Sequence, residues 1–242
     1  MSAHAPTVGI IYPGHAAEDD YALAAGMLGA QLPLAHVYGT DLHAADELLD
    51  LGAPERLAEG AQRLAPHRPG SVMWACTSGG FVRGPEGARR QVERLSRAAG
   101  VPASSTSLAF VAALEVLGVS RVAVAATYPD DVAAMFAGLL GDAGIEIVAA
   151  RSAGITTAAE VGTLAPDRVR ELVLAHERSD AGAVLVPDTA LRTIALVPEL
   201  ESLLGRPVLT ANQVTVWQGL RLAGARTTAT DLGQLFTQEA GS

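Results

Sequence analysis

The chain alternates short, uniformly apolar runs with longer segments in which apolar residues recur at helical spacing. Strand followed by helix, repeated along a chain, requires crossover connections and therefore a parallel sheet. The short runs are apolar at every position, as expected of strands whose sheet is covered on both faces. The pattern therefore predicts an α/β fold.

The predicted strands are all short. They are Val8–Tyr12, Leu34–Val37, Ser71–Ala75, Arg121–Ala126, Glu146–Ala149 and Ala183–Val186, with shorter strands that begin at Val101 and Val208. Helical spacing predicts helices at Glu55–Leu64, Pro85–Ala99, Ser107–Leu117, Asp130–Ala143, Pro166–Glu177 and Val214–Leu222.

The second half of the chain repeats motifs of the first half in the same order. The matched pairs are residues 8–13 with 124–129, 76–77 with 188–189, and 100–102 with 205–207. Ordered matches of this kind favour two similar units over a solenoid array, although chance similarity among Ala/Val/Leu-rich segments stays open. We expect two pseudo-symmetric α/β halves, each a short parallel sheet flanked by helices, with an active site in the cleft between them. Residues 1–115 plus 211–242 are assigned to the first half and 116–210 to the second.

Charge and composition exclude several classes of function. The formal net charge of −9 disfavours a nucleic-acid partner, whose phosphates would be repelled. The chain contains no lysine, which excludes a Schiff-base mechanism, a pyridoxal phosphate enzyme and a P-loop lysine. Its single cysteine, Cys76, cannot form an internal disulfide, as in a reducing cytosol.

The N-terminal residues lack the basic start and the long apolar stretch of a signal peptide. No apolar run approaches the roughly 18 residues that a membrane-spanning helix needs. We therefore expect a cytoplasmic protein without a membrane partner, and a homodimer is left open.

Two strand ends carry candidate catalytic side chains. Cys76 ends the apolar run 71–75 and Asp188 ends the run 183–187, so both would lie where parallel sheets bind ligands. A thiol followed by small residues is placed to have a lowered pKa. The structural alternative is an ordinary buried cysteine, and for Asp188 a solvated turn or a loop cap.

Hydroxyl-bearing residues surround these two positions. Thr77, Ser78 and Thr189 offer hydroxyls and backbone N–H groups that can hold a carboxylate as it gains charge, and Tyr128 adds a phenol. Taken singly, such residues are more often turn formers, helix caps or packing residues. Pro13, at the end of the first strand, completes the predicted substrate-binding set.

The sequence contains no clear metal-binding motif. The six histidines form no His-x-x-x-His pair and no carboxylate cluster at ligand spacing, so no metal is predicted. The acidic turns Glu18-Asp19-Asp20 and Asp130-Asp131 are interpreted as helix caps.

Four stretches together resemble the maleate isomerase and arylmalonate decarboxylase family, within the aspartate/glutamate racemase superfamily. They are residues 11–13, 76–84, 126–132 and 207–217. The resemblance implies two pseudo-symmetric halves, no cofactor, and an enediolate formed in the cleft from a small carboxylate or dicarboxylate. It places Cys76 on the first catalytic cysteine of the isomerases. It places Thr77, Ser78, Tyr128 and the Thr189 amide in the pocket for the substrate carboxylate.

The chain also departs from both groups. Maleate isomerases carry a second cysteine where this chain has Asp188, and a Pro-Ser-Ser-Asn-like turn where it has Pro13-Gly14-His15. Arylmalonate decarboxylases keep their cysteine in the second half and have glycine at the position of Cys76.

These departures leave several reactions open. Our first hypothesis is a cofactor-independent isomerase of the maleate type, with Cys76 as nucleophile and Asp188 as acid/base or orienting group. An arylmalonate-type decarboxylase is the close alternative, in which Cys76 protonates carbon. A racemase would use Cys76 and Asp188 as opposed bases. A cytosolic carboxylate-binding protein without catalysis is the non-enzyme alternative.

Overall fold

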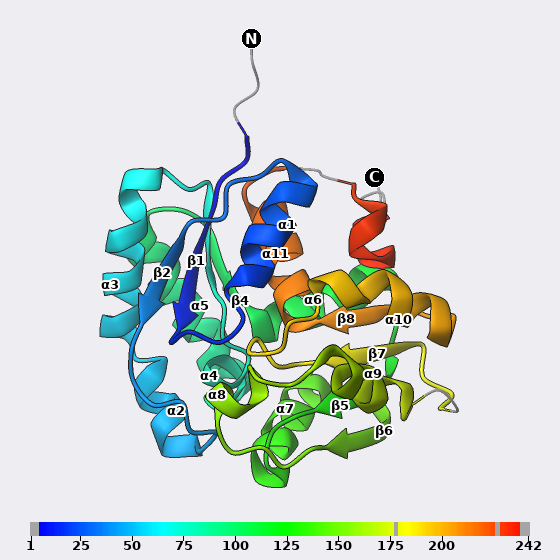
Figure 1. The fold of residues 1–242 in the computed structure, drawn as a ribbon. Coiled ribbons are helices and arrows are strands. Elements are labelled where there is room, and N and C mark those ends of the chain that lie inside the picture. The colour runs from blue at the N-terminus through cyan, green and yellow to red at the C-terminus, as the bar shows by residue number, and fades with distance from the viewer. Residues whose placement is uncertain (1–4, 177–178, 226–227, 238–242) are drawn as a thin grey trace.

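The computed structural model describes residues 5–176, 179–225 and 228–237, and these form two α/β halves (Figure 1). Within them, eight strands form two four-stranded sheets in which every pair is parallel. The first sheet contains β1 (Val8–Pro13), β2 (Leu34–Val37), β3 (Ser71–Trp74) and β4 (Ala103–Ser105). The second contains β5 (Arg121–Ala126), β6 (Glu146–Ser152), β7 (Ala183–Val186) and β8 (Val208–Thr210).

The two sheets share one topology. Their strand orders are β2-β1-β3-β4 and β6-β5-β7-β8, so each runs second, first, third, fourth along its own half. This confirms the predicted pair of similar α/β halves. It also places β3 and β7, the strands that precede Cys76 and Asp188, at equivalent positions.

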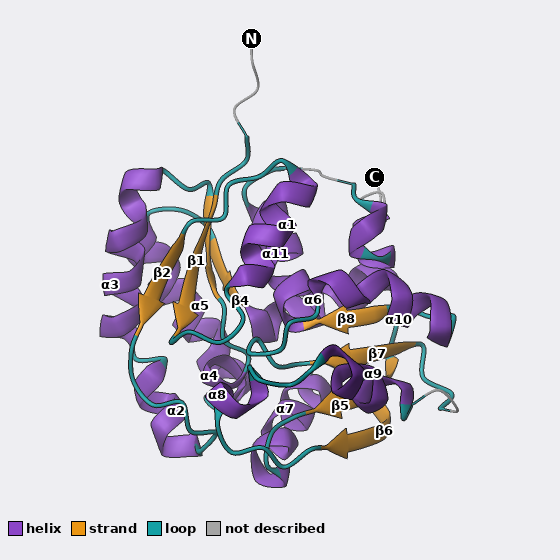
Figure 2. Cartoon of the chain, viewed as in Figure 1, coloured by secondary structure: helices purple, strands orange, loops and turns teal. Residues whose placement is uncertain are grey.

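Helices flank both sheets (Figure 2). They are α1 (Asp19–Leu28), α2 (Ala45–Leu51), α3 (Pro54–Leu64), α4 (Ser78–Phe81), α5 (Gly84–Ala99), α6 (Thr106–Leu117), α7 (Asp130–Asp142), α8 (Ala158–Val161), α9 (Pro166–Leu174), α10 (Val197–Leu204) and α11 (Ala211–Leu222). Single 3-10 turns occupy Ala65–His67, Ile194–Leu196, Thr230–Leu232 and Gln234–Thr237. None of the helices in the described part of the chain combines the length and apolar character needed to cross a membrane.

The predicted helices agree with the observed ones to within a few residues. The helix predicted over Pro166–Glu177 ends at Leu174, and Glu177 itself lies outside the described residues. The strand expected to begin at Val101 begins instead at Ala103, after Pro102, whose nitrogen has no hydrogen to donate to a sheet.

The prediction that Asp20 caps a helix locally is wrong. Asp20 lies in the first turn of α1, but its carboxylate is buried and makes no capping bond there. It accepts hydrogen bonds from the backbone N–H groups of Thr193 and Ile194 and from Asn212 Nδ2. Asp20 therefore ties α1 to a loop of the second half and to α11.

The apolar core runs through both halves. A single cluster of buried apolar side chains contains Met73 of the first sheet and Leu185 of the second, so the two halves share part of one core. The assignment of residues 1–115 with 211–242 and of residues 116–210 as separate units stays a prediction.

Candidate active site

The carboxyl ends of both sheets face one cavity of about 170 Å³. Its wall combines residues that follow β1, β2 and β3 with residues that follow β6 and β7. The lining residues are Tyr12, Pro13, Gly14, His15, Ala16, Thr40, Asp41, Leu42, His43, Leu48, Leu51, Cys76, Ser78, Ala158, Ala159, Asp188, Thr189 and Ala190. Ligands of parallel α/β sheets bind at this edge, so the topology alone explains where the cavity lies.

Two loops from different halves close one side of this cavity. Leu42 pairs with Thr157 in an isolated antiparallel bridge. The backbone N–H of His43 donates to Thr156 O at 2.8 Å, and that of Ala158 donates to Asp41 O at 2.8 Å. Backbone hydrogen bonds therefore join the halves beside the pocket.

Cys76 lies in the turn between β3 and α4, with its side chain buried. Its Sγ accepts a hydrogen bond from the Gly79 N–H at 3.3 Å and lies 3.6 Å from Ser78 Oγ. A Cβ at position 79 would lie 3.1 Å from Sγ and 3.0 Å from Trp74 Cζ2, so a side chain there would be tight against both groups and would make them shift.

Burial raises the pKa of the Cys76 thiol to about 11, against the opposing hydrogen bonds from Gly79 and Ser78, and the negative charge of Asp188 adds to the rise. The expectation of a lowered pKa is therefore wrong for this structure. Loss of hydration disfavours the thiolate more than the donors of the turn stabilise it. At neutral pH, Cys76 holds its proton.

Asp188 follows β7 and is 3% exposed, which does not fit the alternative of a solvated turn. Its Oδ1 accepts a hydrogen bond from the Ala190 N–H at 2.9 Å, and its Oδ2 accepts one from Thr127 Oγ1. Charge-assisted bonds of this kind fix a carboxylate firmly. The structure thus brings Asp188 and Cys76 to the same cavity, as their matched places in the sequence repeat predicted.

The other predicted site residues divide into two sets. Pro13, Ser78 and Thr189 line the cavity. Thr77 and Tyr128 are buried but are not part of its wall, and the Tyr128 hydroxyl donates to Pro187 O. Contact of these two residues with a substrate stays a prediction.

Burial raises the pKa of the Tyr128 phenol well above its ordinary value, and the charge of Asp188 raises it further, while the nearby Thr77 hydroxyl acts in the opposite direction. Tyr128 is therefore a neutral phenol. Its ring packs edge-on against His43 and Phe81, with centroids 4.9 and 5.7 Å apart.

Among the lining residues that were not assigned from the sequence, Tyr12 and His43 are held by hydrogen bonds. The Tyr12 hydroxyl donates to Thr189 O at 2.9 Å and accepts from the Ala17 N–H at 3.0 Å, so it links the strand ends of the two halves. The Tyr-Pro match between residues 12–13 and 128–129 was a signal for Tyr12. His43 is buried, and its Nδ1 lies 3.1 Å from Ile155 O. No sequence signal marked it.

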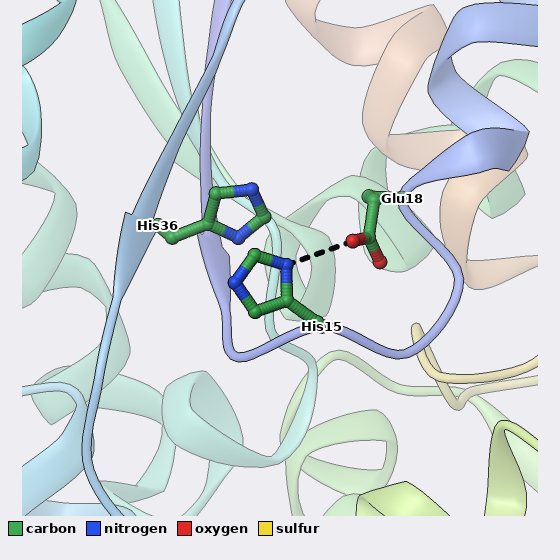
Figure 3. Close-up of side chains that lie close together, drawn as sticks. All are labelled: His15, Glu18 and His36. Carbon is green, nitrogen blue, oxygen red and sulfur yellow. Dashed lines mark hydrogen bonds and ion pairs between the residues drawn. The ribbon is translucent and has the colours of Figure 1, made fainter.

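Potential metal ligands meet beside the cavity. One ligand atom each from His15, Glu18 and His36 lies within 4.8 Å of the other two (Figure 3). Only His15 of the three also lines the cavity.

Comparison with known proteins identifies related enzymes. Residues 50–236 match a family model described as arylmalonate decarboxylase. The arylmalonate decarboxylase of Bordetella bronchiseptica is 31% identical over 187 residues, which cover 76% of this chain and 78% of that protein. The maleate isomerase of Geobacillus stearothermophilus is 24% identical over 214 residues, which cover 86% of this chain and 82% of that protein.

A similar solved structure is that of an arylmalonate decarboxylase variant in its liganded form. It has a TM-score of 0.85 and 28% sequence identity, and the match covers 97% of this chain and 100% of that one. In that variant one glycine is replaced by cysteine and one cysteine by serine. The likeness confirms the predicted fold.

Proposed function

The chain belongs to the arylmalonate decarboxylase family, and we propose that it decarboxylates a small 2-substituted malonate without a cofactor. The observation that carries this proposal is the buried thiol of Cys76 on the wall of the cavity, whose pKa burial raises to about 11. A neutral thiol is a proton donor, whereas addition to a double bond requires a thiolate. Decarboxylation needs such a donor after carbon dioxide leaves.

The reaction balances with the residues of the cavity. The bond between the α-carbon and one carboxylate breaks, its electron pair stays on carbon, and carbon dioxide leaves. The pair delocalises into the remaining carboxylate as an enediolate, near the hydroxyls of Ser78 and Thr189. The Cys76 S–H bond then breaks as its proton moves to the α-carbon. The resulting thiolate, whose conjugate acid has a high pKa, takes up a proton from water.

With Asp188 in the second half, the site has a thiol proton donor on one side only. A second cysteine at this position would offer a second proton donor, whereas a carboxylate held by Thr127 and Ala190 offers none while it is ionised. The negative charge of Asp188 also helps to keep the proton on Cys76. We therefore infer that carbon is protonated from one face and that the product is a single enantiomer.

The maleate-type isomerase, our first hypothesis from the sequence, is the second candidate. It is supported by the related maleate isomerase and by the location of the cysteine in the first half of the chain. The raised pKa of Cys76 disfavours it, because little thiolate is present at neutral pH to attack a double bond. A Cys76/Asp188 racemase requires Asp188 to accept a proton from carbon.

One substrate panel in D₂O separates these reactions by NMR. The proposal predicts that a 2-aryl-2-methylmalonate loses carbon dioxide and gains one deuterium at the α-carbon. Fumarate formed from maleate, with no turnover of the malonate, would instead select the isomerase. Deuterium exchange into a chiral 2-arylpropionate without carbon dioxide loss would select the racemase. A rise in melting temperature with dicarboxylates but no turnover would select the binding protein.

We also infer a location in the cytosol from the single cysteine, which suits a reducing compartment. A homodimer stays a prediction, and sedimentation equilibrium of the purified chain measures it directly.

A further inference from the structure

His15, Glu18 and His36 come from two segments of the chain and meet beside the cavity. His15 lies in the loop after β1, Glu18 directly precedes α1, and His36 belongs to β2. The parallel register pairs Tyr12 with His36, which brings the second strand alongside the loop that carries the other two residues. Figure 3 shows the two imidazole rings facing each other, with the Glu18 carboxylate beside them.

The protein fixes the orientation of His36. Its Nδ1 lies 2.6 Å from Gly14 O. Because a carbonyl oxygen only accepts hydrogen bonds, Nδ1 carries the proton, and in the neutral ring Nε2 keeps a free lone pair. Histidines that bind metals are commonly held in this way, with one ring N–H donated to a backbone carbonyl.

His15 is similarly placed between polar neighbours. Its Nδ1 lies 2.9 Å from Glu18 Oε1, and its Nε2 lies 3.2 Å from the Tyr38 hydroxyl. The rings of His15 and His36 have centroids 4.0 Å apart. Two imidazoles, a carboxylate and a nearby phenol form a mixed nitrogen and oxygen donor set, which suits Zn²⁺ and similar divalent ions.

We propose that His15, Glu18 and His36 bind one divalent transition-metal ion, with the ligand preference of Zn²⁺, beside the cavity. Ligand atoms about 2.1 Å from one ion lie no more than about 4.2 Å apart. The ligand atoms of the three residues lie within 4.8 Å of one another, so a small closing movement is enough to bring all three to one ion. The exposed His15 side chain can supply it by rotation. Figure 3 shows the starting arrangement.

Local sequence spacing could not predict this site, because His36 is brought to the other two residues only by the pairing of β2 with β1. With three protein ligands the ion keeps an open coordination position. His15 also lines the cavity, so this position can take a carboxylate oxygen of a ligand bound there. That second step rests on the proposed function, whereas metal binding itself does not.

The experiment measures Zn²⁺ binding to the metal-stripped, full-length protein by isothermal titration calorimetry. The visible spectrum of the Co²⁺-loaded protein is recorded in parallel. We expect one ion per chain and Co²⁺ bands typical of nitrogen and oxygen ligands. His36→Gln and Glu18→Gln should each weaken Zn²⁺ binding by at least about tenfold. The exposed His67, on the turn after α3, provides the matched control, and His67→Gln should bind as the wild type does.

The proposal is overturned if the wild type binds no Zn²⁺, or if the wild type and both cluster variants bind it equally. A thiolate-to-metal charge-transfer band with Co²⁺, lost in Cys76→Ser, would move the site to Cys76 and also overturn it. Glu18 is only partly buried, so Glu18→Gln is expected to fold. It therefore tests the metal site even if His36→Gln does not fold. Adding an arylmalonate to the Co²⁺ protein tests the open position separately. An unchanged spectrum there would reject only ligation of the substrate.

Discussion

The strand ends that carry Cys76 and Asp188 occupy equivalent places in two sheets of identical order, yet they hold their side chains differently. The Cys76 thiol has two contacts to its sulfur, from the Gly79 N–H at 3.3 Å and Ser78 Oγ at 3.6 Å, and burial raises its pKa. The Asp188 carboxylate has a hydroxyl donor and a backbone N–H donor.

Two halves of the same topology can therefore contribute chemically different side chains to one site. Burial of the thiol favours its neutral form, whereas two hydrogen-bond donors hold the Asp188 carboxylate in one position. The negative charge of Asp188 in turn acts on Cys76 and strengthens its hold on the proton. One half of the molecule therefore supplies the mobile proton, and the other half supplies a fixed electrostatic field.

The largest expected effect comes from removing the mobile proton. Cys76→Ser replaces the thiol by a much weaker acid, so kcat/KM for the arylmalonate should fall by about 10² to 10⁴. Carbon dioxide release measures the loss, and circular dichroism with thermal unfolding shows that the variant is folded. If Cys76→Ser kept wild-type turnover while Asp188→Asn lost it, the roles of the two halves would be reversed.

A smaller effect is expected on stability, when the hydroxyl beside Asp188 and the hydroxyl beside Cys76 are removed in turn. Thr127→Val keeps the shape of the residue but removes the hydroxyl that donates to Asp188, leaving the buried carboxylate short of a partner. The free energy of unfolding should fall by about 1.5 to 3 kcal/mol. Ser78→Ala, beside Cys76, should cost less than about 1 kcal/mol, because sulfur is a weak hydrogen-bonding partner. Urea unfolding at neutral pH measures the free energy of unfolding of both variants. Equal losses of stability would contradict the claim that Asp188 is held more strongly than Cys76.

A still smaller effect concerns pH. The pKa of Cys76 is raised from 9.0 to about 11 in the folded chain, so between these values the native state binds more protons than the unfolded state. Stability therefore falls as pH rises through this window, and the contribution is complete only below it. Buried tyrosines act in the same direction at higher pH, so the measurement compares urea unfolding of the wild type and Cys76→Ser. The variant should lose less stability between about pH 8.5 and 10.5; parallel curves would count against a raised thiol pKa.

The sequence predicted the fold well because the central strands β1, β3, β5 and β7 are buried along almost their whole length and are therefore apolar at most positions, whereas β6 is partly exposed. The repeat also placed Cys76 and Asp188 in equivalent loops, and the structure brings both to one cavity. Such features depend on local pattern and on order along the chain, which the sequence displays directly.

Other features depend on packing that no local pattern encodes. The sign of the Cys76 pKa shift was mispredicted because burial, which outweighs the donors of the turn, is a property of the assembled halves. Asp20 was predicted to cap a helix, but its carboxylate accepts a hydrogen bond from the backbone N–H of Thr193, in a loop of the other half. His36 reaches His15 only through the pairing of two strands.

The central claim is that Cys76 holds its proton under the influence of Asp188. Because the chain has a single cysteine, the rate of its alkylation by a small reagent reports the thiolate fraction of this residue alone. The account predicts a rate that still rises at about pH 10, and a curve displaced to lower pH in Asp188→Asn, which removes the neighbouring charge. A plateau reached below about pH 8.5, the ordinary thiol value, with the same curve in Asp188→Asn, would contradict it.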